Sequence, residues 1–145
     1  MTVTVKKITM WRGEVDDRPG VLASTLEPLA QAKADLKMVM GYRLPSQEGR
    51  AAIGVHPVSG KKATDAARNA GLAASETPTL LVEGDNRPGL GHAIATAIAD
   101  ANINLSFVVA QVVGRRYSAV LAFENQSDAT RAAALVRKAS AAKPR

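Results

Sequence analysis

Residues 83–92 read EGDNRPGLGH and residues 14–22 read EVDDRPGVL, so an acidic turn with Arg-Pro-Gly occurs twice in this chain of 145 residues. Sliding the sequence by 69 positions, the difference between 87 and 18, places Arg18 on Arg87. The match then continues without a gap for about 30 residues, with similar residue types at matching positions. Because a fixed offset is the signature of duplicated structural units, we expect two copies of one supersecondary unit.

Each copy is predicted to form a helix directly after the turn. Proline suits the first turn of a helix because it needs no N–H partner there. Apolar residues then recur at helical spacing, which turns one stripe inward: they are Leu22, Leu26 and Leu29 in the first copy and Leu90, Ile94 and Ile98 in the second. Pro28 stands where the second copy has Ala97, so we expect a kink or an irregular last turn in the first helix only.

Alternating or continuous apolar runs predict the strands of each copy. In the first copy they cover residues 5–15, 36–44 and 51–58, with a short final strand at 72–76; in the second they cover residues 80–84, 103–113 and 117–124. Alanine-rich helices are expected at 61–70 and 127–139. The second copy has no obvious last strand, so its sheet edge must be covered by residues 2–7, by another chain, or by nothing.

The predicted fold class is α+β. Each copy reads as a β-α-β-β-α unit of the ferredoxin-like, split β-α-β kind, to which the first copy adds a short final strand. This is an antiparallel sheet with helices on one face, and we expect the two units side by side. Residues 1–77 are predicted to form the first unit and residues 78–145 the second. A unit of about 70 residues is marginally stable alone. Since aromatic residues make up 3% of the chain, aliphatic packing must supply the core.

Composition excludes several classes of protein. The chain has no cysteine, and no apolar run approaches the roughly 20 residues of a membrane helix. Its start lacks the apolar segment of a secretory signal, so we expect a cytoplasmic protein with no membrane partner. The net charge of +6 comes from 19 Lys and Arg against 13 Asp and Glu, dispersed along the chain. We interpret this charge as solvated surface. Nucleic-acid binding is not expected, because the strands lack the stacking aromatics of an RNA-binding sheet.

The turn itself suggests a binding chemistry. Unpaired N–H groups in the first turn of a helix, together with the positive end of the helix dipole, can hold a carboxylate or a phosphate. The glycine removes a side chain where a ligand approaches, and the Asp and Asn oxygens can accept hydrogen bonds from an ammonium group. Such a turn fits a free amino acid, which carries both charges. The same residues are also typical of an ordinary helix start, in which Asp or Asn caps the helix and Gly relieves crowding without any ligand.

The repeated pattern resembles the ACT domain, a small regulatory ligand-binding module. The resemblance covers about residues 5–139 and rests on DDRPGVL…ADLKMVMGYR in the first copy and DNRPGLGHAIATAIADANINLSFVVAQ in the second. It implies β-α-β-β-α-β units that pair side by side into a larger sheet. It also implies an effector, often an amino acid, that binds between two units, where the turn after the first strand of one unit faces the start of the second strand of its neighbour.

Carried over position by position, the resemblance implies a ligand site at the turn and the second-strand start of the second unit: Asp85, Asn86, Arg87, Pro88, Gly89, Leu90, Gly91, Asn104 and Leu105. The counterparts in the first unit form a second, weaker candidate site: Asp16, Asp17, Arg18, Pro19, Gly20, Val21, Asp35 and Leu36. The first unit has aspartates where the second has Asn86 and Asn104, and added carboxylates repel an incoming carboxylate. We therefore expect the second unit's turn to be the better anion acceptor. Which unit or chain completes each site stays open.

A non-catalytic regulatory function is predicted. Two isolated histidines and no cysteine give no nucleophile or metal-ligand pattern, so we expect no catalytic residue, no metal and no cofactor. We expect the protein to bind a small effector, an amino acid, between ACT units, and to act as a homodimer whose changed surface is recognised by an unidentified partner protein. One alternative is a protein-interaction or dimerisation module without a ligand. Another is a nucleic-acid-binding domain with a similar split β-α-β sheet.

Overall fold

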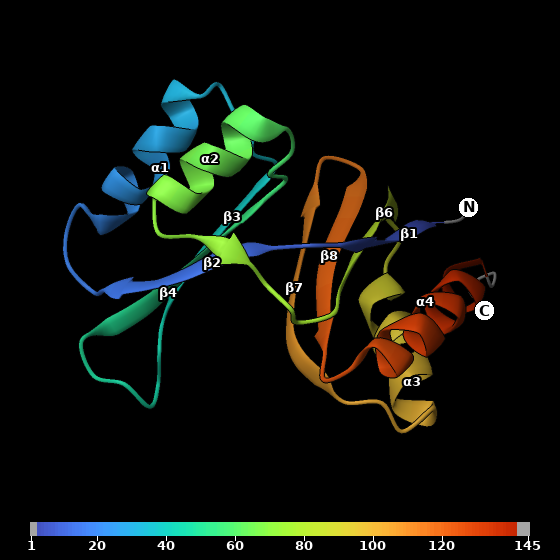
Figure 1. Cartoon of the computed structure of the whole chain (residues 1–145). Coiled ribbons are helices and arrows are strands. Elements are labelled where there is room, and N and C mark those ends of the chain that lie inside the picture. Colours follow the sequence, from blue (N-terminus) through green and yellow to red (C-terminus); the bar gives the residue numbers. More distant parts are fainter. Residues whose placement is uncertain (1–2, 142–145) are drawn as a thin grey trace. The chain divides into compact units, whose positions relative to one another are not determined.

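The computed structural model describes residues 3–141 and divides into two α+β units (Figure 1). The strands are β1 Val3–Ile8, β2 Trp11–Asp16, β3 Met38–Arg43, β4 Arg50–His56, β5 Ala73–Ala74, β6 Thr79–Asp85, β7 Leu105–Val113 and β8 Arg116–Phe123. The helices are α1 Val21–Gln31, α2 Lys61–Asn69, α3 Leu90–Asp100 and α4 Gln126–Ala141. Apart from the first strand of the first copy, these bounds lie within two residues of those predicted. Among the described residues, no helix has the length and apolar character needed to cross a membrane.

Each unit holds one antiparallel sheet of four strands. The N-terminal unit, residues 9–76, has the strand order β3-β4-β2-β5. The C-terminal unit, the β1 segment with residues 77 onward, has the order β1-β6-β8-β7. Figure 1 shows the two helices of each unit on one face of that unit's sheet. The units therefore repeat one architecture, as the sequence offset predicted.

The first strand crosses from one unit into the other. β1 pairs antiparallel with β6, from Val3 opposite Gly84 to Ile8 opposite Thr79, and so supplies the strand that the second copy lacks. Of the three possibilities for covering that sheet edge, the structure shows the first, in which the N-terminal segment pairs with β6. The predicted single strand at residues 5–15 is therefore wrong, because the alternation continues through two strands that lie in different sheets. The division at residues 77 and 78 likewise differs from the structure, in which β1 belongs to the C-terminal unit.

Helix α4 fixes β1 in place. The Arg137 Nη2 atom donates a hydrogen bond of 2.8 Å to the Val5 carbonyl, and the Lys7 Nζ atom donates one of 2.8 Å to the Thr130 hydroxyl. Val3 and Val5 are buried in the core of the C-terminal unit. The outer edge of β1 is thus partly occupied by side chains of its own unit, which hinders strand addition there.

Aliphatic side chains form a separate core in each unit. Leu29, Ile53 and Val55 centre the core of the N-terminal unit. The larger core of the C-terminal unit includes Leu80, Ile98 and Val136 with Phe123, and all four are almost fully buried. Burial of each such side chain contributes roughly 1.5–3 kcal/mol.

Helices α1 and α3 begin and end at equivalent residues. Both have 11 residues and follow a glycine with positive φ, 87° at Gly20 and 84° at Gly89. In both, the second residue after the helix has a left-handed φ, 59° at Lys33 and 58° at Asn102. Pro28 therefore does not shorten α1 relative to α3, and the kink or irregular last turn expected there stays a prediction. Proline removes one N–H donor inside α1, whereas the bonds that close the helix end use other backbone groups, such as Ala34 N to Leu29 O at 3.0 Å.

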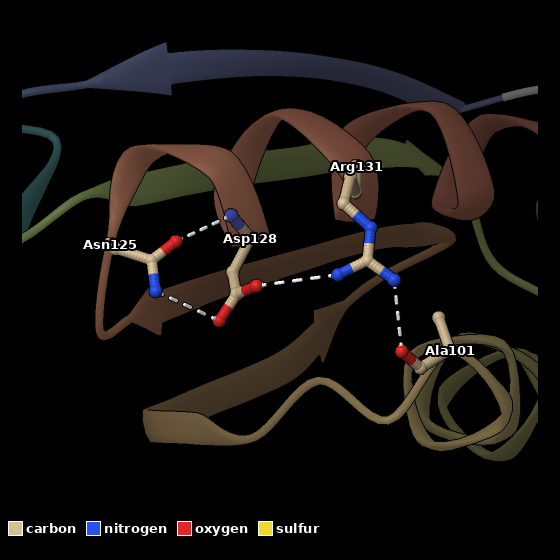
Figure 2. A network of polar contacts seen from close by, with 4 residues as sticks. All are labelled: Ala101, Asn125, Asp128 and Arg131. Atoms are coloured by element: carbon tan, nitrogen blue, oxygen red, sulfur yellow. Dashed lines mark hydrogen bonds and ion pairs between the residues drawn. The ribbon is translucent and has the colours of Figure 1, made fainter.

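A polar network ties the start of α4 to the end of α3 (Figure 2). The Asn125 side chain accepts a hydrogen bond of 2.8 Å from the Asp128 N–H, which caps α4. Arg131 contacts the Asp128 carboxylate at 3.5 Å and donates a hydrogen bond of 3.0 Å to the Ala101 carbonyl. The end of α3 is thus anchored to α4, while its start faces the turn at residues 85–89.

Candidate functional site

The two turns share one backbone geometry, and their glycines are required by conformation. Gly20 and Gly89 both have φ in the left-handed region, where a residue with a Cβ is disfavoured. A Cβ at either glycine would meet no atom within 4 Å, so neither glycine relieves crowding. No side chain caps α1 or α3. The ordinary explanation of the turn, in which Asp or Asn caps the helix, therefore does not hold, in contrast to the Asn125 cap of α4.

The uncapped start of α3 presents backbone donors. Leu90 N bonds the Arg87 carbonyl at 3.2 Å and Ala93 N bonds the Gly89 carbonyl at 2.9 Å. The amides of Gly91 and His92, which lie between these two, have no hydrogen-bond partner within residues 3–141. Free amides at the positive end of a helix dipole are suited to an anion.

Strand pairing gives the acidic residue of each turn a basic partner. Arg116 lies opposite Asp85, and Arg50 lies opposite Asp16. The ion pairs measure 3.1 Å for Asp85 and 2.7 Å for Asp16. The sequence did not reveal either arginine as part of the turn region. Each begins the strand after a hairpin, and only the pairing register of that strand with its neighbour brings the arginine beside the turn. An aspartate paired in this way repels an incoming carboxylate less than a free one does.

Some predicted site residues serve the fold instead. Leu90 is 2% exposed and packs in the core, and Leu105 packs against the same core from its edge. Leu36 packs likewise against the core of the N-terminal unit. Arg87 is half-buried, and its Nη2 atom lies 3.4 Å from the Ala139 carbonyl of α4. Asn86 is exposed, with its N–H bonded to the Arg115 carbonyl at 2.8 Å.

The turn and the second-strand start do not meet within one unit. Asp85 pairs with Arg116 at the beginning of β8, whereas Leu105 pairs with Phe123 at its end. At about 3.3 Å per residue, these two ends of β8 are roughly 20 Å apart. The N-terminal unit repeats this separation, since Asp16 pairs at the beginning of β4 and the strand after Asp35 and Leu36 begins opposite its end. The nine predicted residues of the C-terminal unit therefore do not form one site within that unit.

Tyr117 is a residue of the turn region that the sequence did not reveal. It pairs with Gly84, and its ring belongs to the core of the C-terminal unit, with 8% of the residue exposed. A Cβ on Gly91 would lie 3.7 Å from the Tyr117 hydroxyl, so this hydroxyl reaches the start of α3. Burial raises the pKa of Tyr117 above its ordinary value of 10.0. No described residue hydrogen-bonds the hydroxyl, and no buried polar side-chain atom within residues 3–141 lacks a partner, so the hydroxyl reaches solvent.

A groove with a volume of about 400 Å³ lies beside the other turn, in the N-terminal unit. Its lining includes Asp16, Arg18 and Val21 of the second candidate site, and also Arg50 and Glu14. It runs along the flank of α1 rather than over the free amides at the start of that helix. Two carboxylates and two guanidinium groups line it, a balance that suits a ligand with both charges.

Three solved structures share this architecture. Protein BT0572 from Bacteroides thetaiotaomicron superposes with a TM-score of 0.71 at 13% identity, over 92% of this chain and 98% of that one. The regulatory subunit of aspartate kinase from Thermus thermophilus, in its ligand-free form, matches with a TM-score of 0.62 at 17% identity, over 96% and 97% of the two chains. Clostridium acetobutylicum aspartate kinase matches at 0.60 and 13% identity, over 95% of this chain and 34% of that enzyme. No protein-family model matches the sequence, and the search of curated proteins finds no match.

The chain has the fold of these structures, an α+β arrangement of antiparallel sheets and helices. The predicted fold class is thereby confirmed. The matched aspartate kinase subunit is a regulatory one, and it is covered almost entirely by this chain. At these identities the likeness concerns the fold, so the properties of the candidate sites depend on the residues present here.

The two units differ in charge at equivalent positions. Asp17 of the N-terminal unit pairs with Arg43 at 2.8 Å, whereas its counterpart Asn86 is neutral. Asp35 pairs with Lys37 at 2.6 Å, and its counterpart is Asn104. The start of α3 is therefore the less acidic of the two.

Proposed function

We propose that this protein is a non-catalytic regulatory protein that binds a small effector, an amino acid, through its ACT units. The observation that carries the proposal is the uncapped start of α3 beside the Tyr117 hydroxyl. The free amides of Gly91 and His92 and this hydroxyl are donors from two elements of the C-terminal unit. Donors placed in this way suit the carboxylate of an amino acid.

The exposed side of the turn supplies acceptors for the ammonium group. The amide oxygen of Asn86 and the carboxylate of Asp85 stand directly before Arg87, Pro88 and Gly89 in the chain. Arg116 neutralises much of the Asp85 charge, so the turn can accept a zwitterion without strong repulsion of its carboxylate. We expect neutral and small amino acids to fit better than dicarboxylic ones.

A second copy of the chain completes this proposed site. The outer strand β7 carries no charged residue over its whole length, and its Val108, Val109 and Val113 are 54%, 47% and 67% exposed. Such an edge favours pairing with another strand. If two β7 strands pair antiparallel about a two-fold axis, the start of one lies beside the end of the other. Asn104 and Leu105 of one copy would then lie at the same end of the joined sheet as the turn of its partner, because the end of β7 and Asp85 both lie at the beginning of β8.

A thermal-shift survey of the twenty amino acids tests this proposal. A ligand that binds the native state alone raises the apparent stability, by about 2.7 kcal/mol at a concentration 100 times its Kd. We expect at least one amino acid to raise the melting temperature of the wild-type chain. A survey in which no amino acid does so would contradict the proposal.

The alternative is a dimerisation module without a ligand, and one observation favours it. The apolar β7 edge is present whether or not the turn binds anything, and Asp85 already has a partner in Arg116. In that case two copies associate through β7 and present a surface to a partner protein. The survey separates the two functions, because dimerisation then persists while every amino acid leaves the melting temperature unchanged.

A further inference from the structure

A second pocket of the N-terminal unit is lined by lysines. It lies at the end of the sheet away from the turn at residues 16–20, and its volume is about 450 Å³. Its walls come from the segment after α1, the segment before α2 and the first turn of α2. Four lysines line this lysine pocket, namely Lys33, Lys37, Lys61 and Lys62. Asp35 is the one acidic residue among its lining residues.

The positive charge of the lysine pocket is only partly compensated. Lys37 contacts Asp35 at 2.6 Å and Lys61 contacts Asp65 at 2.9 Å, but these side chains are well exposed, and exposed ion pairs are weak. Lys33 and Lys62 make no ion pair or side-chain hydrogen bond with any described residue. Four lysines therefore line one pocket that has a single acidic residue in its lining.

The fold does not require these lysines. In the C-terminal unit, Asn102 stands at the position of Lys33 and has nearly the same φ, 58° against 59°. Ser106 stands at the position of Lys37, and α4 begins with Gln126 and a serine where α2 begins with two lysines. Asparagine adopts the left-handed region more readily than lysine. The same architecture thus forms with neutral residues, and the N-terminal unit carries its lysines in addition.

Backbone donors add to the side chains. The first residue of α2 is Lys61, and no side chain caps this nine-residue helix. Thr64 N bonds the Gly60 carbonyl at 3.0 Å, and the three amides before it have no partner within residues 3–141. Gly60, Lys61, Lys62 and Ala63 all line the pocket.

We propose that the lysine pocket binds a small multivalent anion of the phosphate class, held by Lys33, Lys37, Lys61 and Lys62. An amino acid would leave most of these ammonium groups uncompensated, whereas a diphosphate brings several charges and many acceptor oxygens. The volume lies in the range of roughly 300–1,000 Å³ that is usual for small-molecule sites. This binding is independent of the proposed amino acid site, because it uses different residues, which belong to the N-terminal unit rather than the C-terminal one.

Calorimetric titration of the full chain with pyrophosphate tests the inference. The test variant carries Lys33→Asn and Lys62→Gln, the first of which copies Asn102 and keeps the backbone conformation. The matched control carries Lys6→Gln and Lys138→Gln, two exposed lysines of the C-terminal unit, and so loses the same net charge. We expect the test variant to bind pyrophosphate roughly tenfold more weakly than wild type and the control to change less than about twofold. Unfolding midpoints without ligand establish that both variants fold.

Titrations with ATP and with adenosine distinguish a nucleotide from free pyrophosphate as the source of the phosphate group. Tighter binding of ATP than of adenosine, lost in the same variant, supports recognition of the phosphates of a nucleotide. No binding of pyrophosphate by the wild-type chain would overturn the inference, as would equal weakening in the control. Binding of a short DNA duplex through these lysines without binding of pyrophosphate would also overturn it, since the pocket would then belong to a nucleic-acid surface.

Discussion

Arg116 lies opposite Asp85 in the β6–β8 pairing, and its Nη1 atom contacts the Asp85 Oδ1 atom at 3.1 Å. Arg50 has the same relationship to Asp16 in the N-terminal unit, at 2.7 Å. In both units the register places the first residue of one strand opposite the aspartate that ends its neighbour. The recurrence of this pair shows that the duplication extends to the charges beside the turn, and not only to the turn itself.

Removing the arginine of this pair is expected to affect binding more than stability. The side chains of Arg116 and Asp85 are 63% and 44% exposed, so Arg116→Gln should lower the free energy of unfolding by less than about 1 kcal/mol. The freed Asp85 carboxylate should repel an anionic ligand at the start of α3. Urea denaturation measures the change in the free energy of unfolding. A loss above about 2 kcal/mol would mean that the pair holds the fold together.

Truncating Val5 is expected to destabilise the C-terminal unit, although Val5 precedes the N-terminal unit in the chain. Val5 is 6% exposed in the core of the C-terminal unit, so Val5→Ala should cost about 1.5–2.5 kcal/mol. Hydrogen exchange should speed up in β6, the strand to which β1 pairs. The control is Lys6→Ala, whose side chain is exposed. Faster exchange confined to β2 would contradict the pairing of β1 with β6.

The sequence predicted the elements well and their assignment to units less well. The offset of 69 residues and the apolar spacing placed the helices and the second and third strands of each copy. The break near Thr9 and Met10 carries neither Gly nor Pro, so nothing in the local pattern marked the passage from one sheet to the other. The glycine turns and their position before a helix could be predicted, and the sequence left open whether a side chain caps the helix. Tyr117 and the arginine partners depend on strand register. Register is a tertiary property, and a single sequence does not reveal it.

Two glycine substitutions beside α3 are expected to have opposite effects on stability. Gly91→Ala places a Cβ 3.7 Å from the Tyr117 hydroxyl, which is an ordinary contact, and replaces glycine in a helix, so it should stabilise by up to about 1 kcal/mol. Gly89→Ala must hold a Cβ at φ 84° and should destabilise by about 1–2 kcal/mol. Thermal unfolding measures both. Equal effects of the two substitutions would show that the turn geometry differs from that described.

Gly91→Ala should also reduce binding, because the added methyl group partly covers the Tyr117 hydroxyl. The expected combination is a higher melting temperature without ligand and a smaller rise with the amino acid. An undiminished rise would place the ligand away from the start of α3.

The Tyr117 hydroxyl should make stability depend on alkaline pH. Burial raises its pKa in the folded protein above the ordinary value of 10.0, so the folded state holds this proton more tightly than the unfolded state. The corresponding stability is fully present below pH 10 and is lost as the pH rises through the folded-state pKa. Denaturant unfolding of wild type and Tyr117→Phe is measured from about one pH unit below to about one and a half units above the ordinary tyrosine pKa. The free energy of unfolding should fall more steeply with rising pH for wild type than for the variant. Parallel curves would contradict a raised pKa of Tyr117 in the folded protein.

A lysine in the middle of β7 is expected to prevent association of two copies. Val109 is 47% exposed near the centre of the strand, so Val109→Lys places two like charges close together in an antiparallel β7 pair. Sedimentation should show a dimer for wild type and a monomer for the variant, with unchanged circular dichroism. Thr4→Lys on the β1 edge serves as the control. A variant that remains dimeric would show that another surface mediates association.

Binding of an amino acid to wild type and to Tyr117→Phe is the most direct measurement of the proposed effector site. The substitution removes one hydroxyl that no described residue hydrogen-bonds, so the unliganded melting temperature at neutral pH should stay the same. A hydrogen bond to a charged group contributes about 1.5–3 kcal/mol, so the amino acid that stabilises wild type should bind the variant roughly ten- to a hundredfold more weakly. Equal affinity of both proteins would contradict a carboxylate site formed by the Tyr117 hydroxyl and the first amides of α3.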